Sequence, residues 1–223
     1  MNAPCKLCEK KRARRHCPGI EGDICPSCCG AERENSIDCP SACEYLQEAR
    51  LREHPAPPAE DAIPNQDIRV SEDFLREQEP VVVWMSEALT RAMERERAVD
   101  QDAREALDAL IRTYRTLDSG LIYETRPTNP YAAALQDALK TAVEKLRQQL
   151  TESSGLHTLR DADILGVLVF LQRIEFQYAN GRRRGRAFYD FLNSHFPAAP
   201  LDPTDSQVIS AVSPLVNPPL VNQ

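Results

Sequence analysis

This sequence lacks abundant aromatic side chains, long apolar runs and an apolar leader. Only 6% of its 223 residues are aromatic, with a single tryptophan, Trp84. The longest apolar stretch, residues 164–171, is less than half the length of about 20 residues that a membrane-spanning helix needs. Residues 1–10 contain no apolar segment of the kind found in secretory signals. These absences predict a soluble, cytoplasmic protein that does not bind membranes.

The usual marks of a catalytic centre are also missing. The sequence has no Gly-x-Ser-x-Gly elbow, no Gly-x-x-x-x-Gly-Lys phosphate loop and no Glu-x-x-His pair for a di-iron bundle. His157 and His195 each stand alone in the sequence, so we interpret them as surface or capping residues. The formal charge of −7 argues against a surface built throughout for nucleic acid. We therefore expect a protein that is not an enzyme.

Cysteine, in contrast, is concentrated at the N-terminus. All eight cysteines lie within the first 43 residues: Cys5, Cys8, Cys17, Cys25, Cys28, Cys29, Cys39 and Cys43. In a reducing compartment, thiols at such a density indicate a metal site rather than disulfides. Two Cys-x-x-Cys pairs, Cys5/Cys8 and Cys25/Cys28, are about twenty residues apart, and each can reach one ion from a tight turn.

Eight thiols can hold two zinc ions with four ligands each. We predict that Cys5, Cys8, Cys25 and Cys28 bind the first Zn²⁺ ion, and that Cys17, Cys29, Cys39 and Cys43 bind the second. This arrangement leaves no coordination position open, so both ions are expected to be structural rather than catalytic. The alternatives are one zinc ion with spare thiols, an iron–sulfur cluster, or a redox switch.

The interleaved spacing resembles that of the cross-brace, treble-clef-like zinc fingers, which include the RING, B-box, MYND and HIT-type families. The resemblance covers residues 5–46. Those families usually offer two ligands at the second position, often including a histidine, whereas this chain has only Cys17 beside His16. His16 is therefore an alternative to Cys29 in the second site, and Cys28 and Cys29 could exchange roles. Spacing alone transfers neither ligase activity nor a partner to this chain.

The N-terminal segment has too few large apolar side chains to fold around a core of its own. In small finger peptides, each structural zinc ion contributes on the order of 10–16 kcal/mol to folding. We therefore expect this segment to be unfolded without metal.

Two basic clusters could bind an anion. One comprises Lys10, Lys11, Arg12, Arg14 and Arg15, and the other comprises Arg182, Arg183, Arg184 and Arg186. The first interpretation is a contact with phosphate or nucleic acid. The second is a solvated surface, on which the arginines of the later cluster pair with acids such as Asp190 and Glu175.

Composition divides the chain into four parts. Residues 1–52 are predicted to form the zinc-binding module, residues 53–66 a Pro-rich linker, residues 67–196 a helical bundle, and residues 197–223 a flexible, Pro-rich tail. The tail contains two short apolar pairs, Val208-Ile209 and Leu215-Val216, that could dock elsewhere.

Apolar residues recur at helical spacing through the bundle. Ser71 is typical of a helix N-cap, and Pro80 is expected to break or kink the helix that follows. Further helices are expected at about 100–117, 131–150, 159–178 and 185–195, with a short one at 45–51 that closes the finger. The helix at 159–178 is apolar almost all round, so it should lie at the centre of a four- or five-helix bundle. The fold class is therefore mainly α.

Together these features predict a non-enzymatic zinc-binding adaptor that acts through protein–protein interaction. The first alternative is a protein that binds RNA or DNA through residues 10–15 and 182–186. The second alternative is a thiol redox sensor.

Overall fold

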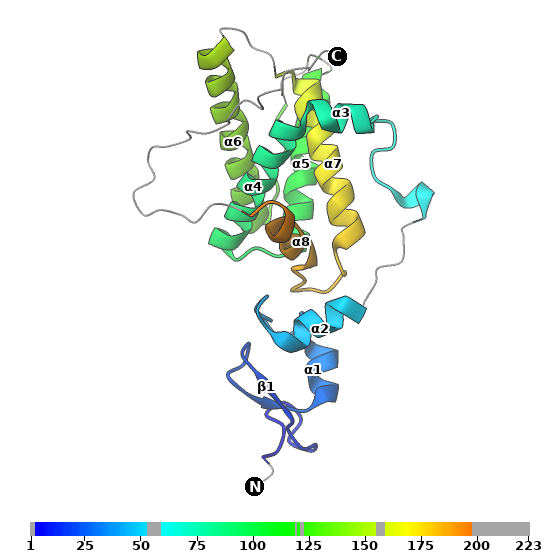
Figure 1. Cartoon of the computed structure of the whole chain (residues 1–223), viewed down its shortest axis with the longest axis vertical. Coiled ribbons are helices and arrows are strands. Elements are labelled where there is room, and N and C mark those ends of the chain that lie inside the picture. The colour runs from blue at the N-terminus through cyan, green and yellow to red at the C-terminus, as the bar shows by residue number, and fades with distance from the viewer. Residues whose placement is uncertain (1–2, 53–58, 119, 121–122, 155–158, 198–223) are drawn as a thin grey trace, which may run out of the picture.

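The computed structural model describes residues 3–52, 59–118, 120, 123–154 and 159–197. A small N-terminal finger lies at one end of a larger helical body, and α2 is close to the junction between them (Figure 1). The described chain is mainly helical, as the sequence predicted. The predicted tail from residue 198 onward, part of the linker (residues 53–58) and His157 lie outside the described residues.

The finger is built from a hairpin and two short helices. Strand β1 (Arg15–Cys17) pairs antiparallel with β2 (Gly22–Ile24), and the helices are α1 (Pro26–Glu32) and α2 (Glu44–Arg52). Cys25 is the N-cap of α1, because its sulfur accepts a hydrogen bond from the Cys28 backbone N–H and Pro26 occupies the first turn. The helix that closes the finger was predicted at 45–51, and α2 confirms it.

The described residues of the body form a short 3₁₀ turn, η1 (Glu60–Ala62), and six α-helices. These are α3 (Glu72–Glu77), α4 (Glu79–Glu96), α5 (Asp100–Asp118), α6 (Pro130–Ser154), α7 (Asp161–Tyr178) and α8 (Ala187–His195). Ser71 caps α3 as predicted, since its hydroxyl accepts from the Phe74 N–H. Pro80 lies in the first turn of α4, which explains why the helical segment divides there.

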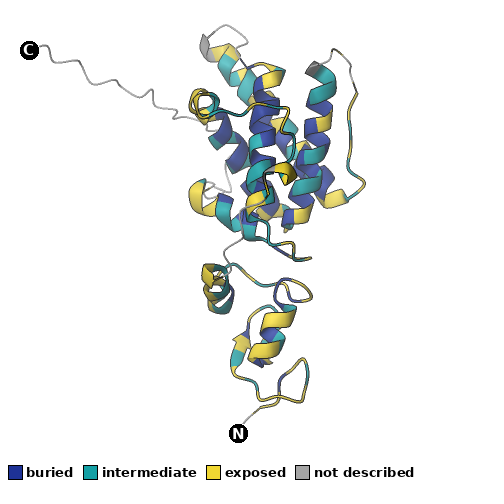
Figure 2. Ribbon diagram, turned by 90° about the vertical axis from the view of Figure 1, so that its right-hand side faces the viewer, coloured by how far each residue is buried: buried dark blue, intermediate teal, exposed yellow. Residues whose placement is uncertain are grey.

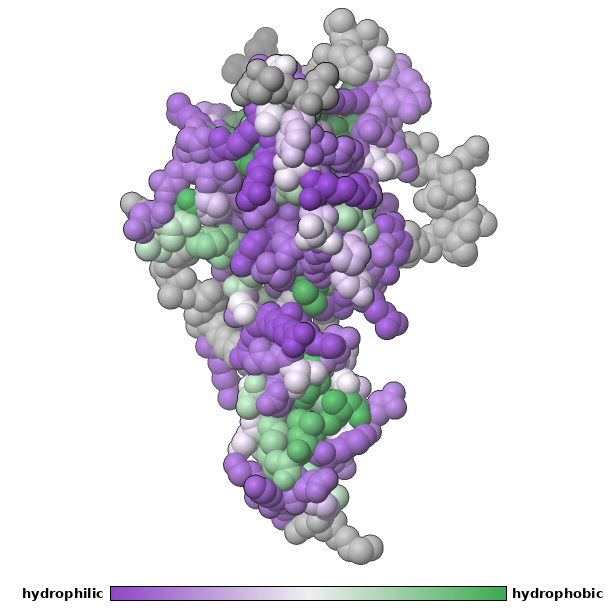
Figure 3. All heavy atoms as spheres, turned by 180° about the vertical axis from the view of Figure 1, so that it is seen from behind, coloured by the Kyte–Doolittle hydropathy of each residue, from purple (hydrophilic) through white to green (hydrophobic). Residues whose placement is uncertain are grey.

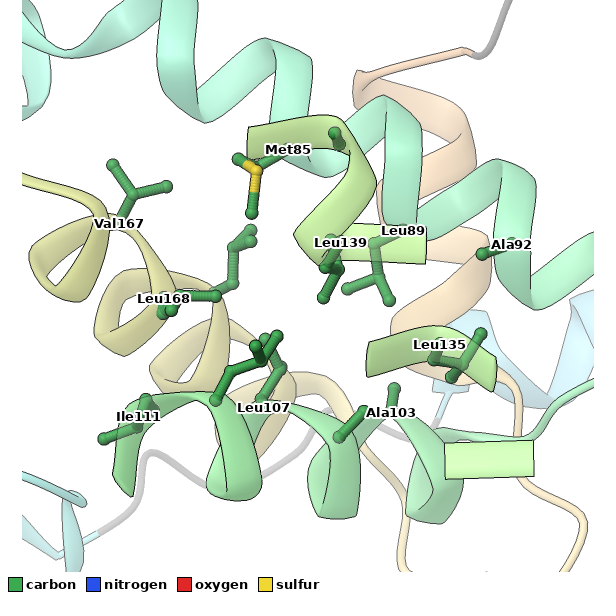
Figure 4. Close-up of a cluster of buried hydrophobic side chains, with 14 of the residues drawn as sticks. Met85, Leu89, Ala92, Ala103, Leu107, Ile111, Leu135, Leu139, Val167 and Leu168 are labelled. Atoms are coloured by element: carbon green, nitrogen blue, oxygen red, sulfur yellow. The ribbon is translucent and has the colours of Figure 1, made fainter. Parts of the chain in front are cut away.

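The core of the body forms where α5 packs on α7 and α6, and α4 packs on α6. Helix α7 is buried on several faces, as expected for a central helix. Figure 2 shows the buried faces of the helices turned toward one another, and Figure 4 shows the side chains that meet inside. Met85, Leu89, Leu107, Leu139 and Leu168 are among those fully buried.

Buried polar contacts fix the ends of the body helices. Glu175 on α7 is 1% exposed and accepts three hydrogen bonds of 2.9–3.1 Å from the Arg104 guanidinium on α5. Asp100, at the start of α5, accepts hydrogen bonds from the Phe188 and Tyr189 N–H groups at the start of α8. A carboxylate from one helix thus caps another, which sets the direction of α8.

The apolar core of the finger is much smaller. Ile24, Ile37 and Leu46 are its fully buried aliphatic side chains, and cysteines make up most of the rest. Seen from behind, the finger shows apolar side chains gathered on its surface, whereas the adjoining face of the body is mostly hydrophilic (Figure 3). A module with so little interior needs another source of stability, and metal binding is the obvious one.

Candidate metal centre and its contact with the helical body

Four cysteines of the finger converge on one point. The sulfur atoms of Cys5, Cys8, Cys25 and Cys28 all lie within 4.8 Å of one another. Among the residues that the structure describes, this is the one group of His, Cys, Asp or Glu side chains with ligand atoms so arranged. The predicted first set of ligands is therefore brought together, and the group could hold one metal ion.

The backbone positions these sulfurs from two directions. Cys5 and Cys8 lie in a turn in which the Glu9 N–H donates to the Cys5 carbonyl at 2.8 Å. Cys25 lies between β2 and α1, as the N-cap of α1, and its own N–H donates to the Cys5 sulfur at 3.2 Å. Cys28 is on the first turn of α1, so its N–H faces the Cys25 sulfur at 3.4 Å. The start of a helix therefore supplies half of the group, with its positive dipole end directed at sulfur.

The surroundings of these thiols shift their pKa values in different directions. Burial raises the pKa of Cys5, but N–H donors from Cys8, Cys25 and Leu7 outweigh it and lower the pKa from 9.0 to about 6. N–H donors from Lys10 and Lys11 likewise lower the pKa of Cys8. The hydrogen bond with Cys25, burial and the other thiols raise the pKa of Cys28 to about 12. Thiolates so close together repel one another, and a bound cation removes that repulsion.

The other four cysteines line a common cavity, but among the described residues their sulfur atoms do not form a second close group like that of the first four. Cys17, Cys29, Cys39 and Cys43 line one cavity of about 10 Å³, which is about the space that one water-sized sphere occupies. The remaining walls of this cavity include Ile24, Ile37 and Leu46. Burial raises the pKa of Cys39, although a hydrogen bond from the Glu34 backbone N–H opposes it. Repulsion from Cys17, Glu34 and Cys43 adds to the same upward shift of the Cys39 pKa.

His16 borders the same cavity, but its imidazole has another partner. Its Nδ1 atom lies 3.2 Å from the Asp23 carboxylate across the hairpin, and 71% of its side chain is exposed. Cys29 is buried on α1, and its sulfur accepts a hydrogen bond of 3.4 Å from Arg15 Nη1. Cys28 and Cys29 are adjacent on α1, yet Cys28 belongs to the first group and Cys29 lines the second cavity.

Between the two thiol groups and the body lies Glu34, a residue that the sequence did not single out. It lies two residues after the end of α1, has a left-handed backbone with φ of 53°, and is 1% exposed. Its carboxylate accepts hydrogen bonds from Arg50 of α2 at 2.6 Å, Asn180 at 2.8 Å and the Arg186 N–H at 3.2 Å. Its carbonyl accepts from the Arg184 N–H at 2.7 Å. A single finger residue thus receives three groups from segment 180–186 of the body.

The later arginine cluster forms the other side of this contact. Arg182 donates to the Arg33 carbonyl at 2.8 Å, and Arg184 approaches the Asp38 carboxylate at 3.9 Å. Arg186 turns the other way, donating to the Ala98 carbonyl at 3.2 Å and lying over the Tyr189 ring. Arg183 is exposed.

The acids expected to pair with this cluster have other partners. The suggestion that its arginines pair with Asp190 and Glu175 is wrong, because Arg50 contacts Asp190 and Arg104 binds Glu175.

The earlier basic cluster is distributed along the outside of the finger. Lys10, Lys11, Arg12 and Arg14 are exposed, and Lys11 donates to the Ser27 hydroxyl at 3.1 Å. Arg15 is half-buried and lies 4.5 Å above the Tyr45 ring. His195, at the end of α8, hydrogen-bonds with Ser194 and stacks on Phe191, which is consistent with a surface residue.

Comparison with known proteins does not assign the chain to a family. The chain matches no protein-family model, and neither a curated protein nor a solved structure matches it. No helix in the described part of the chain has both the length and the apolar character that crossing a membrane requires.

Proposed function

We propose that this protein is a non-enzymatic adaptor whose finger is held in shape by two structural zinc ions. The proposal rests on two adjacent residues of α1 that lie in different sites. Cys28 is grouped with Cys5, Cys8 and Cys25, whereas Cys29 lines the other cavity. Interleaved groups of this kind tie the two ends of the finger together, as expected for a cross-brace module. A metal there orders the scaffold that presents its surface to a protein partner.

The donor set fits zinc. Soft thiolates select Zn²⁺ among the common divalent ions, and four of them satisfy its tetrahedral preference without a water ligand. The ligands proposed for the second ion are Cys17, Cys29, Cys39 and Cys43, with Cys29 preferred over His16 because the imidazole is turned toward Asp23. Arg15 beside Cys29 would offset part of the negative charge of a four-thiolate site. Thiol ligands also require a reducing compartment, so we assign the protein to the cytoplasm.

Metal analysis by native mass spectrometry tests the two-site arrangement. The purified chain should carry two zinc ions, and Cys5→Ser and Cys17→Ser should each reduce the count to one. Cys28→Ser and Cys29→Ser should also leave one ion each, but in different sites. Combining Cys28→Ser with Cys5→Ser should therefore still leave one ion, whereas combining it with Cys17→Ser should leave none. A full count of two after Cys17→Ser and Cys29→Ser would contradict the proposed second site.

Cobalt substitution tests whether the sites are structural. Cobalt-loaded protein should show the absorption of tetrahedral thiolate coordination, and added azide should not change it because no position is open. A spectral change with azide would indicate an open position and a catalytic centre. Rapid oxidation of the thiols by a mild oxidant in the zinc-loaded protein would favour the redox-sensor alternative instead.

A second candidate function is binding to RNA or DNA. It is favoured by the exposure of Lys10, Lys11, Arg12 and Arg14 on one module. Three of the four arginines in the later cluster have contacts within the chain, so the finger would have to supply most of the phosphate contacts. Affinity should then decrease steeply with salt, and replacement of Lys10, Arg12 and Arg14 by Gln should reduce that dependence. Absence of binding at low salt would exclude this function.

A further inference from the structure

The body carries a surface groove that is independent of the metal sites. It runs between α4 and α6 and has a volume of about 490 Å³. Its floor is formed by small side chains: Ala88 and Ala92 on α4, and Ala134, Ala138 and Ala142 on α6. Such small residues allow the backbone of another segment to approach closely. Trp84 lies at one end, where its indole N–H donates to the Ala142 carbonyl at 2.8 Å.

The edges of the groove are cationic. Arg91, Arg95 and Lys145 line it, and Asp137 is the one acid among its lining residues. Both carboxylate oxygens of Asp137 are bound by Arg126 at 2.8 Å, which offsets that negative charge. Within the described part of the chain, Arg91 and Arg95 pair with their helix neighbours Glu87 and Glu96, and exposed pairs of this kind are weak. In a chain with a net charge of −7, a positive groove is a local exception that favours an acidic occupant.

We propose that the occupant is the chain's own C-terminal segment, residues 202–213. Residues 197–223 contain two acids, Asp202 and Asp205, and no lysine or arginine. Val208, Ile209 and Val212 have the spacing of one apolar helix face. Asp202 and Pro203 are typical of a helix start, and Pro214 of the position just after a helix end. The segment therefore matches the groove in charge and in apolar character.

The length of this segment and its point of attachment also fit the groove. A helix over residues 203–213 would be about 16 Å long, and the α4 wall from Trp84 to Arg95 covers a similar length at about 1.5 Å per residue. The segment is attached through α8, which packs directly on α4. The residues between Phe196 and Asp202 can span roughly 20 Å when extended. Such a short tether gives an effective concentration in the millimolar range, so a weak contact is enough to fill the groove.

Trp84 provides a reporter for this contact because it is the one tryptophan in the chain. In the full-length protein, Ile209→Asp combined with Val212→Asp should shift Trp84 emission to longer wavelength as water enters the groove. Adding a synthetic peptide of residues 198–223 to this variant should restore the original emission with saturation. The matched control is Leu220→Asp, which changes an apolar residue outside the segment and should leave the emission unchanged.

Charge reversal on the groove provides a second measurement. Arg91→Glu combined with Lys145→Glu should weaken peptide binding by on the order of tenfold, since each new acid repels the segment. Arg112→Glu, at an exposed position on α5, should have little effect.

Two outcomes would overturn the proposal. The first is an unchanged emission in the Ile209/Val212 variant together with no response to the peptide. The second is an emission that depends on protein concentration but not on these substitutions, which would assign the groove to a second copy of the chain. Neither outcome bears on the proposed metal sites, because the groove lies wholly in the body.

Discussion

The Glu34 carboxylate accepts a hydrogen bond of 2.8 Å from the side-chain amide of Asn180, a residue 146 positions later in the chain. The same carboxylate binds Arg50, which in turn contacts Asp190 on α8. The Glu34 backbone N–H also lowers the pKa of Cys39, a proposed metal ligand, against the larger effect of burial. One short loop of the finger therefore contacts both the second thiol group and the helical body, so the order of one should depend on the other.

Glu34→Gln should release the finger from the body. The substitution keeps the size of the side chain but removes the charge that Arg50 and the Arg186 N–H share, and loss of one partner of a buried ion pair costs about 3–5 kcal/mol. Hydrogen exchange at residues 180–186 should then become faster in the zinc-loaded protein. Glu48→Gln, at an exposed position on α2, is the control and should leave exchange unchanged. Equal protection in both variants would show that Glu34 does not hold the contact.

Removal of metal should unfold the finger and leave the body folded. The finger has only three fully buried aliphatic side chains, whereas the body has an extensive core of its own. After chelation, we expect amide resonances of residues 3–46 to collapse into the unfolded range. Those of α5 and α7 should keep their dispersion, and exchange at residues 180–186 should rise as it does in Glu34→Gln. A finger that keeps its dispersion without metal would argue against metal-dependent folding.

The helices of the body could be predicted because local signals there agree with the final packing. Apolar spacing, the Ser71 cap and the Pro80 break all lie within a few residues of the structure they specify. Helix α1 was not predicted, since Cys28-Cys29-Gly30 shows no apolar stripe. Two features of the sequence could have indicated this helix. Cys25 can act as its N-cap, and the adjacent thiols of Cys28 and Cys29 have to point toward two different sites.

The contact around Glu34 could not be predicted from the sequence. An acid beside an arginine in a loop is common, and nothing local indicates that Glu34 would be buried against a segment so distant in the chain. The four-cysteine group was predictable because metal coordination restricts the spacing of its ligands.

Gly166→Ala should destabilise the body, although alanine is the better helix former. A Cβ atom at position 166 of α7 would lie 2.5 Å from Cζ of the Phe74 ring. Overpacking of this kind costs about 1–3 kcal/mol, which exceeds the gain of roughly 0.5–1 kcal/mol in helix propensity. Urea unfolding of the zinc-loaded protein, followed by Trp84 fluorescence, measures the difference. In a Phe74→Leu background the same substitution should be neutral or stabilising, and an equal loss in both backgrounds would exclude the Phe74 contact as the cause.

Asp100 should make the body less stable as pH rises toward neutrality. Burial raises its pKa from 3.8 to about 7, although the N–H groups of Phe188 and Tyr189 oppose the shift. Between about pH 4 and 7 the folded state therefore keeps a proton that the unfolded state has lost, so this stabilisation is present at low pH and disappears as pH passes 7. The shift of the Asp100 pKa from 3.8 to about 7 corresponds to a contribution of about 4 kcal/mol at most. Asp100→Asn removes this titration, so the free energy of unfolding of the variant should depend less on pH between 4.5 and 7.5.

The control is Asp137→Asn. Arg126 lowers the pKa of Asp137, so the small contribution of Asp137 to stability should instead disappear as pH falls below about 4. If the wild-type and Asp100→Asn curves run parallel from pH 4.5 to 7.5, Asp100 does not titrate in this range.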